Sequence, residues 1–151
     1  LMFEGLNAER LLAAAAALGI GEYALSKAVD YAKQRKPFGK PIGSYQAVQH
    51  RLALAKAELE AARLMTYHAA ERFDAGEDAG TQANMAKLLA SRAALDAVEA
   101  AIQTHGGYAF DRDYDIITLW PMARLIAIAP VNNEMLLNYI GEHVLGLPKS
   151  Y

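Results

Sequence analysis

The chain has 151 residues, 54% hydrophobic and 21% charged, which is the composition of one compact globular domain. Fifteen Lys and Arg against seventeen Asp and Glu give a formal net charge of -2, so neither nucleic acid nor an anionic membrane is favoured as a partner. The sequence has no cysteine, which excludes disulfides, thiolate nucleophiles and Cys-ligated metals and is compatible with a reducing compartment.

The first predicted element is a helix from Asn7 to about Arg35, because its apolar residues recur at alternating steps of four and three. The residues predicted to form its buried face are Leu11, Ala15, Leu18, Leu25, Val29 and Ala32. Glu22 occupies the skipped position; it is either a weak candidate base or a partner for a cation on a neighbouring helix. The longest apolar run, residues 11–20, is about half of a membrane span, so we expect no membrane span.

Two prolines in residues 36–41 predict a turn, since proline disfavours helical geometry in the residue before it. A second long helix is predicted from Ser44, a good N-cap residue, to Phe73. A third is predicted from about Asp78 to Thr104, ending at the glycine pair 106–107. Short connections of this kind favour antiparallel neighbours.

The remaining residues are interrupted by Pro121 and Pro130, and they predict a short helix over 114–129 and another from Asn132 or Asn133 to Leu145. Repeated alanines allow helix axes to approach closely. The sequence therefore predicts an all-α fold, an up-down four-helix bundle with an additional short helix, in a single domain over residues 1–151.

General motifs exclude several chemistries. None of the four histidines has Glu three residues before it, so the pattern of a di-iron bundle is absent. The sequence also has no His-Glu-x-x-His zinc pattern, no phosphate-binding loop and no nucleophile elbow. We therefore expect no metal site.

Ordered landmarks carry a resemblance to a known family. They are Asn7-x-Glu9-Arg10, Tyr31-Ala32-x-x-Arg35-x-x-Phe38-Gly39-x-x-Ile42-x-x-x-Gln46, Ala86-Lys87, and Gln103-x-x-Gly106-Gly107-x-x-Phe110. In order and spacing this chain resembles the acyl-CoA dehydrogenases, FAD-dependent enzymes whose subunit has an amino-terminal helical domain, a middle β-domain and a carboxy-terminal bundle. The resemblance covers most of the chain and implies a carboxy-terminal bundle domain that lacks the two preceding domains.

The resemblance implies that FAD is shared between subunits of a homodimer or homotetramer. The residues it assigns to FAD binding are Arg35, Phe38, Gln46, Gln103, Gly106, Gly107 and Asn132, where Asn132 stands in place of the family's threonine. Simpler explanations exist for two of these features: Arg35 could be a cation at a helix C-terminus, and the glycine pair could be a C-cap.

The implied reaction removes a proton alpha to a thioester carbonyl by a carboxylate, while the beta hydrogen leaves as hydride to the flavin. Many members carry this base shortly before the last helix, where we align Pro130. Isovaleryl- and long-chain-type members carry it early on the first bundle helix, in a stretch resembling Glu9-Arg10-Leu11. Glu9 is therefore the predicted base; a carboxylate in a first helical turn is its simpler explanation.

Asn7 and Arg10 match family positions near the CoA moiety, although an N-cap and a solvated surface residue are the ordinary alternatives. The implied partners are an acyl-CoA substrate and an electron-transfer acceptor. The implied location is the cytoplasm if the source is bacterial, and otherwise a reducing organelle matrix. Other functions to be weighed are a non-catalytic partner subunit and a helical-bundle interaction module.

Overall fold

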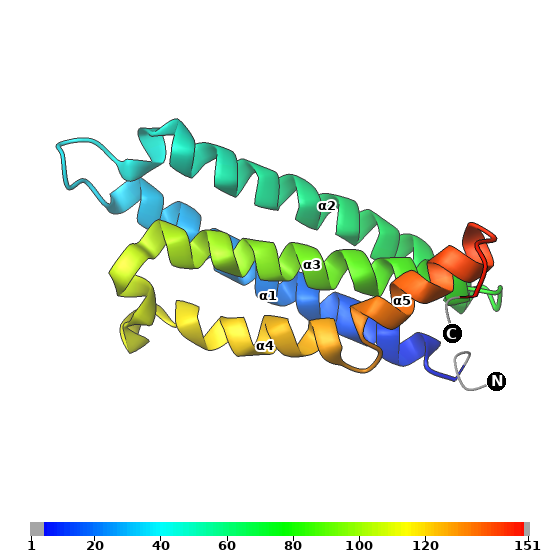
Figure 1. Ribbon diagram of the computed structural model, residues 1–151. Helices are drawn as coiled ribbons and strands as arrows, with labels where there is room; N and C mark the ends of the chain where they lie inside the picture. Colours follow the sequence, from blue (N-terminus) through cyan, green and yellow to red (C-terminus); the bar gives the residue numbers. More distant parts are fainter. Residues whose placement is uncertain (1–4, 150–151) are drawn as a thin grey trace.

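The computed structural model describes residues 5–149, and in that range the chain forms helices and turns without a β-strand. Four helices run up and down beside one another, and a fifth, short helix closes one end (Figure 1). Their bounds are α1 Asn7–Gln34, α2 Gln46–Asp74, α3 Gly80–His105, α4 Ile116–Ile128 and α5 Asn133–Tyr139. The predicted all-α, up-down bundle is confirmed.

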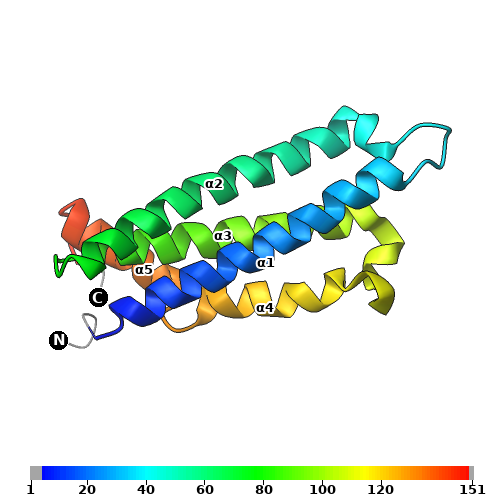
Figure 2. The same ribbon diagram turned by 180° about the vertical axis from the view of Figure 1, so that it is seen from behind.

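Helix α3 is the central element of the bundle. It packs against α1, α2, α4 and α5, and both views show it between the other long helices (Figures 1 and 2). Fifteen of its 26 residues are buried, on more than one face, and most of them are alanines. Small side chains are what allow several helices to approach one helix at once.

The face of α1 that meets α3 is lined by small residues rather than by the large apolar ones. Its fully buried small residues, at steps of three and four, are Ala14, Ala17, Gly21, Ala24 and Ala28. The predicted face was right for Leu18, Leu25 and Ala32, but wrong for Ala15, which is exposed. Because the closest helix contact excludes large side chains, leucines lie at its flanks.

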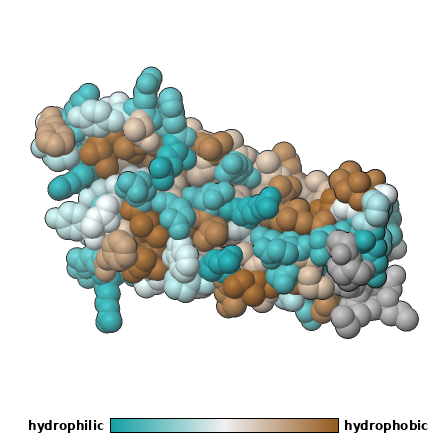
Figure 3. All heavy atoms as spheres, viewed as in Figure 1, coloured by the Kyte–Doolittle hydropathy of each residue, from teal (hydrophilic) through white to brown (hydrophobic). Residues whose placement is uncertain are grey.

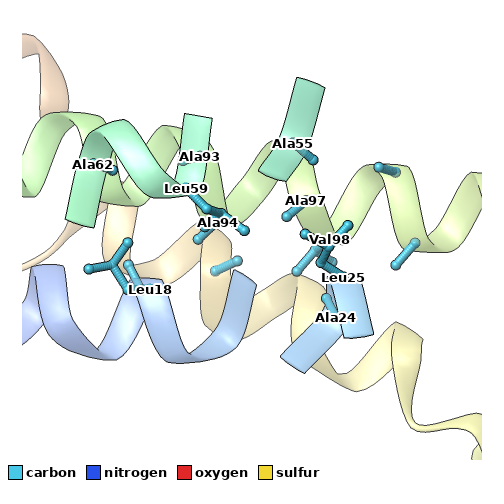
Figure 4. Packing of buried hydrophobic residues seen from close by; sticks show 14 of the residues in the cluster. Leu18, Ala24, Leu25, Ala55, Leu59, Ala62, Ala93, Ala94, Ala97 and Val98 are labelled. Carbon is cyan, nitrogen blue, oxygen red and sulfur yellow. The ribbon is translucent and has the colours of Figure 1, made fainter. Parts of the chain in front are cut away.

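The tightest approach is at Gly21. A Cβ atom built there would lie 2.7 Å from Leu59 Cδ2 and 3.0 Å from Ala94 Cα, so α1, α2 and α3 meet at this point. Figure 4 shows Leu59 of α2 reaching toward Ala94 of α3, and Val98 lying next to Leu25. A glycine is needed here because the backbone of α3 occupies the space of a side chain.

The predicted helix ends agree to within about two residues, with one correction. Ser44 is not the N-cap of α2, because Ile42–Ser44 forms a separate 3-10 turn that the Ser44 hydroxyl closes by donating to Pro41 O at 2.8 Å. Tyr45 precedes α2 and makes no side-chain cap. At the other boundary, Asp78 Oδ1 accepts a bond from Gly80 N, which starts α3.

Helix α4 continues through Pro121, which was expected to interrupt this segment. The proline removes one backbone hydrogen bond near the beginning of the helix. Buried residues on both sides of it, Ile116 before and Ala123 and Ala127 after, hold the two halves in the bundle. The last predicted helix is confirmed as α5, which continues as a π-helical turn over Ile140–Val144.

By length and composition alone, α1 could cross a membrane. Its buried face packs against α2 and α3, and an alanine-rich core helix of a bundle has the same composition. Helix α4 differs, because several of its large apolar side chains are exposed. Figure 3 shows apolar side chains among polar ones on the face that includes α4; the exposed residues of α4 are Trp120, Met122, Leu125 and Ile128.

The two glycines in the middle of α1 give a matched test of this packing. We expect Gly21→Ala to destabilise the chain by about 1–3 kcal/mol, because the new methyl group meets the α3 backbone. Gly19 has no atom within 4 Å of its Cβ position, so Gly19→Ala should stabilise the chain by about 0.5–1 kcal/mol through helix propensity. Urea denaturation measures both, and equal effects of the two substitutions would contradict the close approach.

Candidate functional site

The predicted site residues lie at opposite ends of the bundle. One group, here called the pocket end, comprises Arg35, Phe38, Gln46, Gln103, Gly106 and Gly107. The other, the Glu9 end, comprises Asn7, Glu9, Arg10 and Asn132. Because α1 rises about 1.5 Å per residue, Glu9 and Arg35 are separated by roughly 39 Å along the helix.

The pocket end contains a cavity of about 620 Å³ between the C-termini of α1 and α3. Four predicted cofactor residues, from two segments far apart in the chain, line it together: Arg35, Gln103, Gly106 and Gly107. Gly106 has φ +60°, a conformation that favours glycine, and it ends α3. The C-cap explanation of the glycine pair is therefore correct, and the same backbone faces the cavity.

Aromatic rings form one side of this cavity. Tyr31 stacks on His105 with ring centroids 4.3 Å apart, and Tyr108 lies 6.4 Å from Tyr31. The Arg35 guanidinium lies over the Tyr108 ring at 5.5 Å, a cation–π contact. Arg35 also caps the end of α1, so the helix-terminus explanation holds as well. A cation, aromatic faces and glycine backbone thus face a single cavity.

His105 is buried and stacks on Tyr31. Burial lowers the pKa of His105, and its bond to Ala101 O opposes that effect. Its Nδ1 lies 2.8 Å from this carbonyl oxygen, which can only accept, so Nδ1 carries the proton and Nε2 is left as an acceptor. Burial likewise raises the pKa of the Tyr31 hydroxyl, while Arg35 acts in the opposite direction.

Two predicted cofactor residues lie outside the cavity wall. Phe38 is 82% exposed in the turn between α1 and α2, which extends away from the bundle in Figure 1. Gln46 is the exposed first residue of α2. Its neighbour Ala47 lines a smaller hollow together with Gln103, so Gln46 lies near the cavity but is not part of its lining.

At the Glu9 end, Asn7 and Arg10 are buried rather than solvated. Arg10 is 1% exposed, and its guanidinium donates a hydrogen bond to Asn7 Oδ1. Burial lowers the pKa of Arg10, and Tyr139 acts to raise it. Asn7 is the first residue of α1 and not its N-cap, which is Leu6. Both ordinary alternatives for these two residues are therefore wrong.

Glu9 itself is exposed in the first turn of α1, where a carboxylate suits the helix dipole. The bundle alone does not provide the closed apolar surroundings that a strong carboxylate base needs. Glu22 is different, because it forms an ion pair with Arg63 of α2. The partner explanation for Glu22 is confirmed.

Asn132 is the N-cap of α5: its Oδ1 accepts from Met135 N at 2.8 Å. It lies in the α4–α5 junction, residues 129–132, which also contains Pro130. The junction meets the beginning of α1 through a small apolar cluster of Leu88, Val131 and Leu136, against which Leu6 packs. The structure thus brings the two segments of the Glu9 end together.

The sequence did not assign three residues to either candidate site: Tyr31 and His105 at the pocket end and Lys87 at the Glu9 end. Tyr31 and Lys87 were noted only as family landmarks. Lys87 is fully buried, and its Nζ donates to Val131 O at 2.6 Å and to Asn133 Oδ1 at 3.0 Å. The sequence feature that could have identified Lys87 is its position next to Leu88 on an otherwise apolar helix face, where a lysine is unusual.

Within residues 5–149 no group of three or more His, Asp and Glu side chains could hold a metal ion.

Comparison with known proteins decides the family. The family model described as "Acyl-CoA dehydrogenase, C-terminal domain" matches residues 1–145. The chain belongs to the acyl-CoA dehydrogenase family. It is 45% identical to acyl-CoA dehydrogenase FadE12 of Mycobacterium tuberculosis, over 99% of this chain and 39% of that protein. It is 43% identical to the 3-(aryl)acrylate reductase of Clostridium sporogenes, over 93% of this chain and 37% of the reductase.

Solved acyl-CoA dehydrogenase structures have the same bundle. Butyryl-CoA dehydrogenase of Megasphaera elsdenii superposes with a TM-score of 0.91 at 36% identity, over 95% of this chain and 37% of its own. A glutaryl-CoA dehydrogenase in complex with glutaryl-CoA superposes with a TM-score of 0.91 at 31% identity, over 99% of this chain and 38% of its own. The acyl-CoA dehydrogenase domain described here therefore spans less than half the length of these relatives.

Buried Lys87 predicts a pH-dependent stability. Burial lowers the pKa of Lys87 to about 8 from an ordinary value of 10.5, and Glu134 acts to raise it. Between these pH values the unfolded chain holds a proton that the folded chain has released, so stability rises with pH. Relative to Lys87→Met, the free energy of unfolding of the unchanged protein should gain up to about 3 kcal/mol from pH 7.5 to 10.5.

Urea denaturation of both proteins over this pH range measures the effect. The other titrating groups are common to both proteins and cancel in the difference. A constant difference in the free energy of unfolding across the range would contradict the shifted pKa of Lys87.

Proposed function

We propose that this domain belongs to a longer chain that dehydrogenates an acyl-CoA thioester between its alpha and beta carbons, using FAD. The carrying observation is that Arg35, Gln103, Gly106 and Gly107, predicted as one cofactor site, line one cavity. Membership of the acyl-CoA dehydrogenase family and the likeness to a butyryl-CoA dehydrogenase support the same reaction class. The acyl chain length and the electron acceptor are set outside these residues.

The residues of the pocket end suit the polar half of FAD. A guanidinium can meet a diphosphate with paired charge-assisted hydrogen bonds. Gly107 has open space around its Cβ position, so its backbone is accessible to a ligand. The Gln103 amide can donate or accept. Arg35, Gln103 and the glycine pair would hold the cofactor, and Phe38 and Gln46 would lie along it from the neighbouring turn.

The separation of the two ends supports a cofactor shared between subunits. The roughly 39 Å between Glu9 and Arg35 exceeds the length of one FAD molecule, so one copy of the bundle cannot place both residues at a single cofactor. Two copies related by a two-fold axis resolve this, since each then contributes Arg35 to its partner's FAD and Glu9 to its own. A homodimer is the smallest assembly that fits, and a homotetramer contains it.

At the Glu9 end, the Glu9 carboxylate takes the proton alpha to the thioester carbonyl. FAD, when bound, would supply the acceptor for the beta hydrogen, which leaves as hydride. Glu9 is exposed here, so the preceding domains and the substrate must cover it and thereby raise its basicity. Arg10 and Asn7 hydrogen-bond to each other in the first turn of α1, and the Arg10 guanidinium would supply positive charge near the CoA moiety. The Asn132 amide nitrogen would donate to the flavin, while its Oδ1 accepts from Met135 N as the N-cap of α5.

Glu9→Gln in the complete enzyme should leave FAD bound and lower kcat at least about 1,000-fold, because the amide cannot accept the proton. Flavin absorbance reports cofactor content, and bleaching of that absorbance by substrate reports turnover. The matched control is Glu71→Gln, which changes another exposed helical glutamate and should leave kcat unchanged. Retained turnover in Glu9→Gln would remove Glu9 as the base.

Mixed oligomers test the shared site. We expect Glu9→Gln and Arg35→Ala homo-oligomers each to be inactive, Arg35→Ala through loss of FAD. A mixed dimer of the two should recover about half of the normal activity, because one of its two sites then has both residues intact. If Glu9 and Arg35 served the same cofactor within one subunit, both sites of the mixed dimer would carry a defect and no activity would return.

Pro130 favours one alternative, a non-catalytic subunit that keeps the oligomer interface and half of a flavin site while an active partner supplies the base. Substrate-dependent bleaching of flavin in a purified homo-oligomer would exclude it. The isolated 151-residue chain should bind FAD poorly in either case. For the complete protein we propose the cytoplasm of a bacterium, or a reducing organelle matrix, as the location.

A further inference from the structure

The α4–α5 junction is anchored to the centre of the bundle by one buried cation. Lys87 Nζ donates to the backbone of the junction at Val131 O and to the side chain of Asn133, at 2.6 and 3.0 Å. Ser91, one turn along α3, has its hydroxyl 3.1 Å from the same Asn133 oxygen and 3.1 Å from Leu88 O, and its single proton can be donated to either acceptor. Two α3 side chains thus fix both the path of the junction and the first residue of α5.

Apolar contacts connect the same junction to α1. Val131 packs with Leu88 and Leu136, and Leu6 packs against this cluster. Leu6 lies three residues before Glu9, at the N-cap of α1. The position of the junction is therefore defined relative to both α3 and the residues that lead into the Glu9 turn.

A lysine is an unfavourable choice if the junction needs only to be held down. Burying an ammonium group carries a large desolvation penalty, and its two hydrogen-bond acceptors here are neutral oxygens. A well-packed apolar side chain fills such a space without that penalty. The ammonium group constrains position instead, because both acceptor oxygens must lie at hydrogen-bonding distance from one nitrogen atom.

We propose that Lys87 is a positioning residue for the reaction at the Glu9 end: it fixes the α4–α5 junction, and with it Asn132, relative to the beginning of α1. This inference rests on the proposed function, in which Glu9 and Asn132 face substrate and flavin. Lys87 contacts neither group and acts through the junction. Because reacting groups must be held to a fraction of an ångström, a displaced junction should affect turnover more than binding.

The test compares three single variants of the complete enzyme and the double variant that combines Lys87→Met with Asn133→Leu. Lys87→Met removes the ammonium, and Asn133→Leu removes its acceptor on α5. The matched control is Leu59→Ala, which opens the core where α2 meets α1 and α3 at Gly21 and Ala94, about 10 Å along α3 from Lys87. All are assayed at a temperature at which circular dichroism shows each protein folded, with kcat, KM and flavin content measured for each, and with hydrogen exchange of the peptide covering residues 129–136.

We expect Lys87→Met and Asn133→Leu each to lower kcat about 10- to 100-fold with KM changed by less than about threefold, and their effects not to add in the double variant. Amide exchange in residues 129–136 should be faster in both. Leu59→Ala should lower the melting temperature, with kcat within about twofold and junction exchange unchanged.

A kcat loss in Lys87→Met no larger than in Leu59→Ala, or unchanged exchange in the junction, overturns the positioning role. Failure of the proposed function is distinguishable, because the unmodified enzyme would then not bleach its flavin with any acyl-CoA. The exchange measurement does not depend on turnover.

Discussion

The bundle depends on how closely α1 and α3 approach at Gly21. No side chain separates the two backbones there, and Leu59 fills the remaining space from α2. This contact sets the distance between the long helices, and the alanines of α3 keep that distance small along its length. Both candidate ends are consequences of this packing, since each is built where α1 and α3 begin or end together.

The long, closely packed helices fix the distance between the two ends of the bundle. Helix α1 carries Glu9 in its first turn and Arg35 directly after its last, and its packing on α3 keeps the distance between them fixed. A rigid separation of this size favours a site completed by a second subunit. The exposed apolar residues of α4 are consistent with a surface that the rest of a longer protein covers.

The two ends of the bundle differ in which charged side chains are buried and which are exposed. At the pocket end, burial lowers the pKa of His105, which stacks on Tyr31, and the exposed guanidinium of Arg35 lies over the Tyr108 ring. At the Glu9 end the cations Arg10 and Lys87 are buried, while the carboxylate of Glu9 is exposed. An exposed carboxylate above a buried cationic layer can gain basicity only when other parts of the protein exclude water from it.

The sequence by itself determined the helices and their order, because apolar periodicity, prolines and glycines act over a few neighbouring residues. It also determined the family, since the landmarks from Asn7 to Phe110 keep their spacing without regard to packing. The sequence also allowed glycines 106 and 107 to be interpreted both as a helix end and as a ligand contact, because both interpretations depend on local sequence and family spacing.

Only the tertiary structure decided which faces and which long-range contacts were used. Ala15 and Ala14 are equivalent by composition, but the close contact with α3 selects Ala14. Helix α4 continues through Pro121 because residues on both sides of the proline pack into the bundle. Lys87 and Asn133 are 46 positions apart, and their bond exists because the chain turns back twice. Pairing over such distances depends on how whole helices pack, which local sequence patterns do not encode.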